Sequence, residues 1–289
     1  MRRSSVVVPA LVVLAVIVAA CTGPKKFDLG VEGVDAQIWS QPIGGIDRNW
    51  LVATPEGHTS ESEPIPLVVV LHGATGSIET VLEDTGFAEA AVQNNLALVA
   101  PQGYQGGWNA GVCCLAPVAD DIDDIDFLST VIDEVKDETP ISEVYMVGHS
   151  NGGMMAFRYA CEKPDGIAGF GSVAGTNAAG CTVPEPITML HVHSIDDGIV
   201  PVDGGQSALD FVGELPPVRD EILAVADAGQ CGEPTELRVA NATILRATGC
   251  QEGKQVGLDV LDGDSHNWPV GPYDATQQFL AFWGLTARP

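Results

Sequence analysis

The sequence predicts an α/β protein built on a mainly parallel sheet with helices on both faces. Three observations support this prediction. Short runs of continuously apolar, β-branched residues recur, as in Leu67 to Leu71, and such runs are typical of strands buried on both faces. Helix-like stretches lie between several of these runs. No linker and no change of composition divides residues 37–289, so we expect one globular domain there.

The expected elements follow one another in chain order. The strand-like runs are residues 49–53, 67–71, 96–100, 144–147, 187–193 and 256–261. Helical patterns of apolar residues cover 125–135, 154–161 and 215–228. The segment 54–66 is rich in proline, glycine and acidic residues and is short enough for a surface loop between strands.

The N-terminus has the pattern of an export signal. Arg2 and Arg3 precede an apolar run over residues 6–20, and this run is shorter than the roughly 20 residues that span a bilayer. Small residues directly before Cys21 resemble the lipobox of bacterial lipoproteins, in which that cysteine is acylated. We therefore expect a signal peptide over 1–20, a tether over 21–36 after lipidated Cys21, and an extracytoplasmic protein anchored in the membrane. Ordinary secretion with cleavage nearby is the alternative.

Charge excludes one class of partner. The chain has 13 Lys and Arg against 39 Asp and Glu, a formal net charge of −26. A surface of that sign repels a phosphate backbone instead of releasing its counterions. We therefore expect no nucleic-acid partner.

Six cysteines remain when Cys21 is set aside for lipid: Cys113, Cys114, Cys161, Cys181, Cys231 and Cys250. An even number in an exported protein predicts three disulfides. Adjacent Cys113 and Cys114 would form a strained ring, so we expect each to pair with a distant partner, Cys161 and Cys181 being the candidates. Cys231 and Cys250 are then the remaining pair, although sequence alone leaves 15 pairings open. A metal site is the alternative, but no pair has the Cys-x-x-Cys spacing usual for zinc, and we expect no metal.

A candidate nucleophile lies in the segment 148–152, Gly-His-Ser-Asn-Gly, which fits the G-x-S-x-G turn between a strand and a helix. The strand-like residues 143–147 precede it and the helix-like residues 153–160 follow it. This context would present the Ser150 hydroxyl at the carboxyl edge of the sheet, where open α/β folds place their ligands. We expect Ser150 to be the nucleophile.

The serine needs a base and an acid, which follow it in this fold in the order acid, then histidine. Among the six histidines only His266 lies after any plausible acid, so it is the expected base. Asp196 and Asp197 both follow the strand that ends near residue 193, and spacing alone does not choose between them. On that strand, His191 and His193 lie on one face. Packed or hydrogen-bonded strand histidines are favoured over a metal pair, because no third ligand is evident.

An oxyanion needs two preorganised N–H donors, one of them from the residue after the nucleophile, Asn151. The loop after residue 71 supplies the other. Gly73 and Gly76 allow close approach of the backbone there, so the amide of Ala74 is the expected second donor.

These segments resemble the secreted esterases that include extracellular polyhydroxybutyrate depolymerases, feruloyl esterases and acetylxylan esterases, over about residues 44–283. The matching segments are Leu-His-Gly at 71–73, Trp-Asn-Ala-Gly-Val-Cys-Cys at 108–114, Asp-Asp-Ile-Asp-Phe-Leu at 123–128, Ser-Asn-Gly-Gly-Met-Met-Ala at 150–156 and Ser-Val-Ala-Gly-Thr at 172–176. The family pattern H-x-H-G-x-x-D-x-x-V-P aligns with residues 191–201 and implies that Asp197 is the catalytic acid. Its G-H-x-W-P pattern aligns with 265–269 and supports His266. Ser194 and Ser265 stand where the family has glycine, which puts substrate fit in doubt.

The resemblance implies the α/β-hydrolase fold, serine ester hydrolysis and no cofactor. We expect a carboxylesterase acting on polyhydroxyalkanoate, feruloyl or acetyl-polysaccharide esters. Only 46 residues separate Ser150 from Asp197, which leaves little room for a large lid, so an open cleft for polymer-borne or bulky esters follows. Trp108 and Trp268 are candidate walls of that cleft, with ordinary core packing as the alternative. A serine peptidase on the same fold and a catalytically silent binding lipoprotein remain alternatives.

Overall fold

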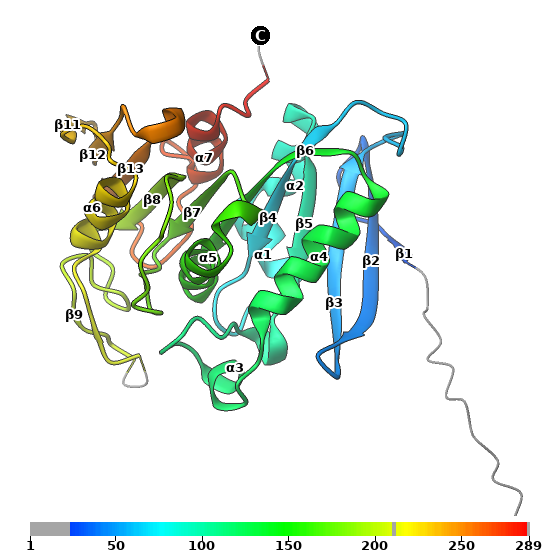
Figure 1. The fold of residues 1–289 in the computed structure, drawn as a ribbon, viewed down its shortest axis with the longest axis horizontal. Coiled ribbons are helices and arrows are strands. Elements are labelled where there is room, and N and C mark those ends of the chain that lie inside the picture. The colour runs from blue at the N-terminus through cyan, green and yellow to red at the C-terminus, as the bar shows by residue number, and fades with distance from the viewer. Residues whose placement is uncertain (1–23, 210–211, 288–289) are drawn as a thin grey trace, which may run out of the picture.

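The computed structural model describes residues 24–209 and 212–287 (Figure 1). The expected signal peptide and the lipidation site Cys21 lie outside the described residues. Within the described ranges, no helix is both long and apolar enough to cross a membrane.

The described chain forms one sheet of eleven strands and a separate two-stranded ribbon. The strands of the large sheet are β1 (Lys25–Phe27), β2 (Val34–Ile43), β3 (Ile46–Pro55), β4 (Ile65–Leu71), β5 (Ala97–Pro101), β6 (Ile141–His149), β7 (Gly169–Val173), β8 (Thr188–Ser194), β11 (Thr235–Val239), β12 (Ala242–Ala247) and β13 (Val256–Leu261). The ribbon pairs β9 (Gly205–Gln206) with β10 (Glu214–Leu215). The helices are α1 (Ile78–Thr85), α2 (Phe87–Asn94), α3 (Leu115–Ala119), α4 (Asp124–Glu138), α5 (Asn151–Glu162), α6 (Val218–Ala228) and α7 (Ala275–Trp283), with short 3-10 turns at Tyr104–Gly106, Pro164–Gly166 and Gln251–Gly253.

The centre of the sheet confirms the prediction of parallel strands. The order is β1-β2-β3-β5-β4-β6-β7-β8-β13-β12-β11, and the six strands from β5 to β13 pair in parallel. Antiparallel strands extend both edges, β1 to β3 on one side and β12 and β11 on the other. Parallel strands share one carboxyl edge, so the loops that follow them meet there.

Two apolar cores, one on each face of the sheet, hold the helices in place. Alternate residues of β4 point to opposite faces, so that Leu67 and Val69 join one core while Val68 and Val70 join the other. The first core contains the apolar faces of α4, α5 and α6, and the second contains those of α1, α2 and α7. Figure 1 shows α4, α5 and α6 on the near side of the sheet, which confirms the expected covering of both faces.

The start of the domain differs from the prediction. The expected tether over 21–36 contains β1 and the beginning of β2, so the sheet begins at Lys25. Phe27, Leu29 and Val31 are partly buried against the core that contains α1, α2 and α7. Burial of these apolar side chains holds the segment on the sheet. The expected helix 215–228 also begins later, at Val218, because Pro216 and Pro217 precede it.

The disulfides correct the expected pairing. Three bonds join Cys113 to Cys114, Cys161 to Cys181 and Cys231 to Cys250. The prediction that the adjacent cysteines reach distant partners is wrong, because Cys161 near the end of α5 meets Cys181 in the loop after β7. Their Cα atoms are 6.1 Å apart, within the range that a disulfide spans. Cys231 and Cys250 pair as expected.

Candidate active site

Ser150 occupies a tight turn between β6 and α5. Its backbone has φ of 52° and ψ of −118°, a left-handed conformation that is strained for a residue with a side chain. A Cβ atom on Gly152 would lie 2.4 Å from the carbonyl oxygen of Leu71, and one on Gly148 would lie 2.2 Å from the carbonyl carbon of Gly152. Close packing of the turn therefore explains why glycine flanks the serine motif on both sides.

Ser150, His266 and Asp197 lie in one chain of hydrogen bonds. The distance from His266 Nε2 to Ser150 Oγ is 2.8 Å, and that from His266 Nδ1 to Asp197 Oδ2 is 2.7 Å. The three residues follow β6, β13 and β8, which are central parallel strands of the sheet. With the Nδ1 proton donated to Asp197, Nε2 is free to accept the serine proton.

The Asp197 carboxylate faces donors on every side. Its Oδ1 atom accepts the N–H groups of Ile199 at 2.9 Å and Val200 at 2.8 Å. Its Oδ2 atom accepts the His266 bond and lies 3.3 Å from His193 Nε2. Burial raises the pKa of Asp197, but the bonds from His193, His266 and Val200 outweigh it and hold the pKa well below the usual range. The carboxylate therefore stays ionised at neutral pH.

The neighbouring aspartate is placed differently. Asp196 is exposed at the surface, and only its backbone N–H is tied down, by the hydroxyl of Ser194. Of the two aspartates that the sequence left open, the structure brings Asp197 to His266.

The expected oxyanion loop lies against the nucleophile. A Cβ atom on Gly73 would be 3.5 Å from the Cβ atom of Ser150. His72 fixes this loop, because its Nδ1–H donates to the carbonyl of Gly73 at 2.8 Å and its Nε2 accepts the N–H of Gly103 at 2.9 Å. Burial lowers the pKa of His72, so the ring is neutral and keeps both bonds.

The two expected oxyanion donors are both available. In residues 24–209 and 212–287, no acceptor takes the backbone N–H of Ala74 or of Asn151. Asn151 opens α5, so its N–H lies at the positive end of the helix dipole. The Asn151 side chain is fully buried and bonds Trp108 twice, accepting its N–H at 2.8 Å and donating to its carbonyl at 3.1 Å.

The expected aromatic walls need a correction. Trp108 is 0% exposed; its indole stacks on Phe127 at a centroid distance of 6.5 Å and donates to the carbonyl of His72 at 2.8 Å. Trp108 is therefore packed in the core, which was the alternative to a cleft wall, and its indole holds the backbone of the expected oxyanion loop. Trp268 is also largely buried, but together with Ala74 and His149 it lines a cavity of about 280 Å³.

Sequence reasoning missed the roles of two histidines. His149 Nε2 donates to the carbonyl of His266 at 3.0 Å and so ties down the loop of the expected base. Burial, assisted by the proximity of His266, lowers the pKa of His149 to about 4. His193 is expected to be packed or hydrogen-bonded in its strand, but the sequence does not name Asp197 as its partner; the four-residue spacing between the two is the signal for this contact. Across the described part of the chain, no three His, Cys, Asp or Glu side chains gather as a metal site.

Comparisons with known proteins show the family to which the chain belongs. Residues 66–193 match the family described as alpha/beta hydrolase fold. The chain is 31% identical over 252 residues to a putative esterase, NocK, of Nocardia uniformis subsp. tsuyamanensis, an alignment that covers 80% of this chain and 73% of that protein. Feruloyl esterase D of Neurospora crassa is 23% identical over 239 residues, with 78% of this chain and 76% of that protein covered.

Two further likenesses are more limited. Feruloyl esterase C of Emericella nidulans is 26% identical over 166 residues, and this alignment covers 55% of the present chain but only 58% of that enzyme. Among solved structures, acetyl xylan esterase from Aspergillus awamori superposes with a TM-score of 0.62 at 13% identity, covering 86% of this chain and 99% of that one. At that identity the likeness shows a shared fold.

Proposed function

The chain belongs to the α/β-hydrolase family and is a serine hydrolase acting on ester bonds, and from this premise we propose that it is a secreted carboxylesterase forming an acyl-enzyme on Ser150. The observation that carries the proposal is the continuous hydrogen-bond chain from Ser150 Oγ through His266 to Asp197. A nucleophile, a base that contacts it and an acid that orients the base are the three parts that such a reaction needs.

The proposed reaction proceeds in two halves. Ser150 Oγ attacks the carbonyl carbon of the ester while His266 Nε2 takes the hydroxyl proton, and Asp197 stabilises the resulting imidazolium. The N–H groups of Ala74 and Asn151 donate to the oxyanion. His266 then gives its proton to the departing alcohol as the carbon–oxygen bond breaks. A water molecule repeats the sequence, which releases the acid and restores the serine.

We propose that the cleft accepts esters of a small or flat acyl group on a bulky or polymeric alcohol. Between Ser150 and Asp197 the chain is fully described and forms only α5, a 3-10 turn, β7, β8 and their connecting loops, with no inserted lid helix. The cavity of about 280 Å³ beside Ala74 and Trp268 is small and partly open, which suits a short acyl chain better than a long lipid tail. The relatives' names, feruloyl esterase and acetyl xylan esterase, point to acyl groups of this kind.

Three disulfides fit an extracytoplasmic location. We propose further that residues 1–20 are a cleaved signal peptide and that Cys21 carries the lipid that anchors the domain. The apolar run ending in small residues before that cysteine supports this proposal.

The test is hydrolysis of p-nitrophenyl esters from acetate to octanoate, with feruloyl esters and 3-hydroxybutyrate oligomers alongside. The oxidised chain without its signal peptide is compared with its Ser150→Ala variant and with Ser129→Ala, a control serine on α4. We expect turnover that falls about 10⁴-fold or more in Ser150→Ala and is unchanged in the control. Folded protein that cleaves no ester, or a Ser150→Ala variant that keeps its activity, would overturn the proposal. Cleavage of amides in preference to esters would identify a peptidase instead.

A further inference from the structure

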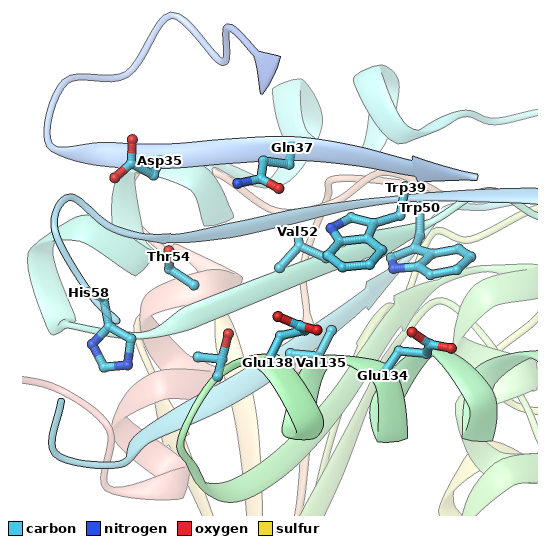
Figure 2. A pocket seen from close by; sticks show the side chains of 11 residues that line it. Asp35, Gln37, Trp39, Trp50, Val52, Thr54, His58, Glu134, Val135 and Glu138 are labelled. Carbon is cyan, nitrogen blue, oxygen red and sulfur yellow. The ribbon is translucent and has the colours of Figure 1, made fainter. Parts of the chain in front are cut away.

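A second pocket lies between the β2–β3 ribbon and the last turns of α4 (Figure 2). Asp35, Gln37 and Trp39 alternate along β2 and therefore point to the same face of the sheet. The residues directly opposite them on β3 are Thr54, Val52 and Trp50. Together with Glu134 and Glu138 of α4, these side chains bound a cavity of about 180 Å³.

This pocket is separate from the serine, which is not among the residues that line it. Thr139, at the end of α4, lines it, and β6 begins two residues later at Ile141. The strand then runs nine residues to His149 before it reaches Ser150, which at about 3.3 Å per residue spans roughly 30 Å. Only the Thr139 end of the pocket is therefore at the opposite edge of the sheet. At the tryptophan end, Val52 pairs with Val99, Val99 with Val69 and Val69 with Met146 of β6. A ligand on the tryptophans would lie three strand spacings of about 4.8 Å from the strand that precedes Ser150.

Two tryptophans form one end of the pocket. The indoles of Trp39 and Trp50 stack with a centroid distance of 6.3 Å and an interplanar angle of 12°. Trp50 is 1% exposed, whereas Trp39 is only half-buried. Figure 2 shows both rings facing the same space, which Val52 borders. A partly exposed indole face supported from behind is a rigid platform for the apolar side of a flat ring.

Two buried polar atoms in the pocket lack partners. Trp50 Nε1 and His58 Nε2 are shielded from solvent, and neither is hydrogen-bonded to any described residue. Figure 2 shows the Trp50 nitrogen directed toward the space between the ribbon and α4. Leaving a buried donor unpaired costs about 1–3 kcal/mol. A ligand that offers an oxygen to the Trp50 N–H would recover this energy.

Three carboxylates, those of Asp35, Glu134 and Glu138, line the pocket and act as acceptors, whereas Gln37, Thr54 and Thr139 can both donate and accept. Glu134 already accepts one bond, from Gln41 Nε2 at 3.2 Å, and Asp35 accepts one from the N–H of Gly57 at 3.2 Å. Each carboxylate keeps further lone pairs, and Glu138 is exposed at the rim. No Lys or Arg is among the residues that line this cavity. An anionic ligand is therefore excluded by charge.

The donor at Trp50 distinguishes two other ligand classes. An organic cation would satisfy the carboxylates and could lie over Trp39, but it would leave the Trp50 N–H unpaired. A hydroxylated ring offers both kinds of group, because each hydroxyl donates to a carboxylate and accepts from an N–H. Its C–H face would pack on the indole. The full set of groups therefore favours a neutral, hydroxylated ring.

We propose that this pocket is a binding site for a neutral pyranose unit, which stacks on Trp39 and hydrogen-bonds to the Trp50 N–H and to the carboxylates of Glu134 and Glu138. Such a site goes beyond ester hydrolysis, because it would hold a saccharide chain on the protein away from the reacting bond. It does not depend on the assignment of the nucleophile.

The experiment is calorimetric titration of the oxidised chain with unesterified xylohexaose and cellohexaose, together with the quenching of tryptophan fluorescence. The variants are Trp39→Ala and Glu138→Gln, and Asp137→Asn, an exposed carboxylate next to the pocket residue, is the matched control. We expect one saccharide to bind, with an affinity that falls about tenfold in Trp39→Ala and Glu138→Gln, as the loss of one stacking or charged contact predicts. The control should bind like the parent.

Circular dichroism and a thermal melt establish that each variant is folded, and p-nitrophenyl acetate turnover should be equal in all three. The Ser150→Ala chain should still bind the saccharide, so that failure of the proposed esterase mechanism and failure of this site are separate results. No binding of either saccharide at millimolar concentration overturns the proposal, as does binding that neither pocket variant weakens. Binding of tetramethylammonium in place of the saccharides would overturn it in favour of a cation site.

Discussion

Replacing Asp197 with asparagine tests how its carboxylate acts. The four groups around it, two backbone N–H groups and the two imidazoles of His266 and His193, are all donors in the structure. An asparagine amide carries one acceptor oxygen and one NH₂ donor group, so the NH₂ group must face at least one of these donors. The change preserves size, but it removes the negative charge and the fit between donors and acceptors.

Two orientations of the amide are possible, and their costs differ. With its NH₂ group toward Ile199 and Val200, two buried backbone donors lose their acceptor, at about 1–3 kcal/mol each. With its oxygen there instead, the NH₂ group faces His266 Nδ1, which must give up its proton and become an acceptor. The second orientation is cheaper, and it moves the imidazole proton to Nε2. In that tautomer His266 cannot take the proton of Ser150.

The expected result is a fall in kcat of about 10⁴-fold with little change in KM. At about 1.36 kcal/mol per factor of ten, this corresponds to about 5 kcal/mol of transition-state stabilisation. The assay is p-nitrophenyl acetate hydrolysis across pH, and the matched control is Asp196→Asn at the exposed neighbouring position. Retention of more than about a tenth of the activity in Asp197→Asn, or an equal loss in Asp196→Asn, would refute the reasoning.

Three further predictions address the turn, a buried acid and a disulfide. Gly152→Ala should lower kcat/KM about 100-fold, because its Cβ would lie 2.4 Å from the Leu71 carbonyl and displace the oxyanion loop, whereas Gly198→Ala, with open space around it, should leave the rate unchanged. Burial raises the pKa of Glu221 to about 7, so its contribution to stability is present below about pH 4.5 and is lost as pH rises through 7. The free energy of unfolding of Glu221→Gln, measured by urea denaturation, should therefore exceed that of the parent by about 2 to 3 kcal/mol at pH 8. The two proteins should be equally stable at pH 4. Replacing Cys161 and Cys181 with serine removes a disulfide between residues 20 apart in sequence. The free energy of unfolding should fall by about 3 kcal/mol in the same assay. An unchanged denaturation midpoint would contradict a disulfide at this position.

The sequence predicts the centre of the sheet well because those strands are buried on both faces and therefore continuously apolar. Residues 49–53 of β3 are predicted as a strand, but the other edge strands escape prediction because they are not buried on both faces. On β2, Asp35, Gln37 and Trp39 place two polar side chains and one apolar side chain on the same partly open face, so this strand has no continuous apolar run. Motif and order suffice to select Ser150 and His266, and the structure places His266 Nε2 2.8 Å from Ser150 Oγ. The choice between Asp196 and Asp197 depends on how the chain turns after β8, which spacing does not encode.

Tertiary contacts also decide which residues near the nucleophile face solvent. Trp108 lies in a glycine-rich loop whose pattern fits an exposed wall equally well. Its indole is buried because the backbone of its own loop is bonded to Asn151, and its Nε1 reaches the carbonyl of His72. These bonds connect segments 36 and 43 residues apart in sequence. Sequence pattern carries no information on such distant pairs, and so it leaves open whether Trp108 is a cleft wall or a core residue.

His191 and His193 on β8 determine which groups the Asp197 carboxylate faces on the side away from His266. His191 Nε2 and His193 Nδ1 are 2.8 Å apart, and burial, followed by the proximity of His193, lowers the pKa of His191 well below its usual value. With His191 neutral and its Nε2–H donated, His193 Nδ1 is the acceptor and the His193 proton is on Nε2. That N–H faces two oxygen atoms, because His193 Nε2 lies 2.7 Å from the Val200 carbonyl oxygen and 3.3 Å from Asp197 Oδ2. The order of tautomers along the strand therefore leaves Asp197 facing donors only, which keeps it ionised and holds the His266 proton on the side away from Ser150.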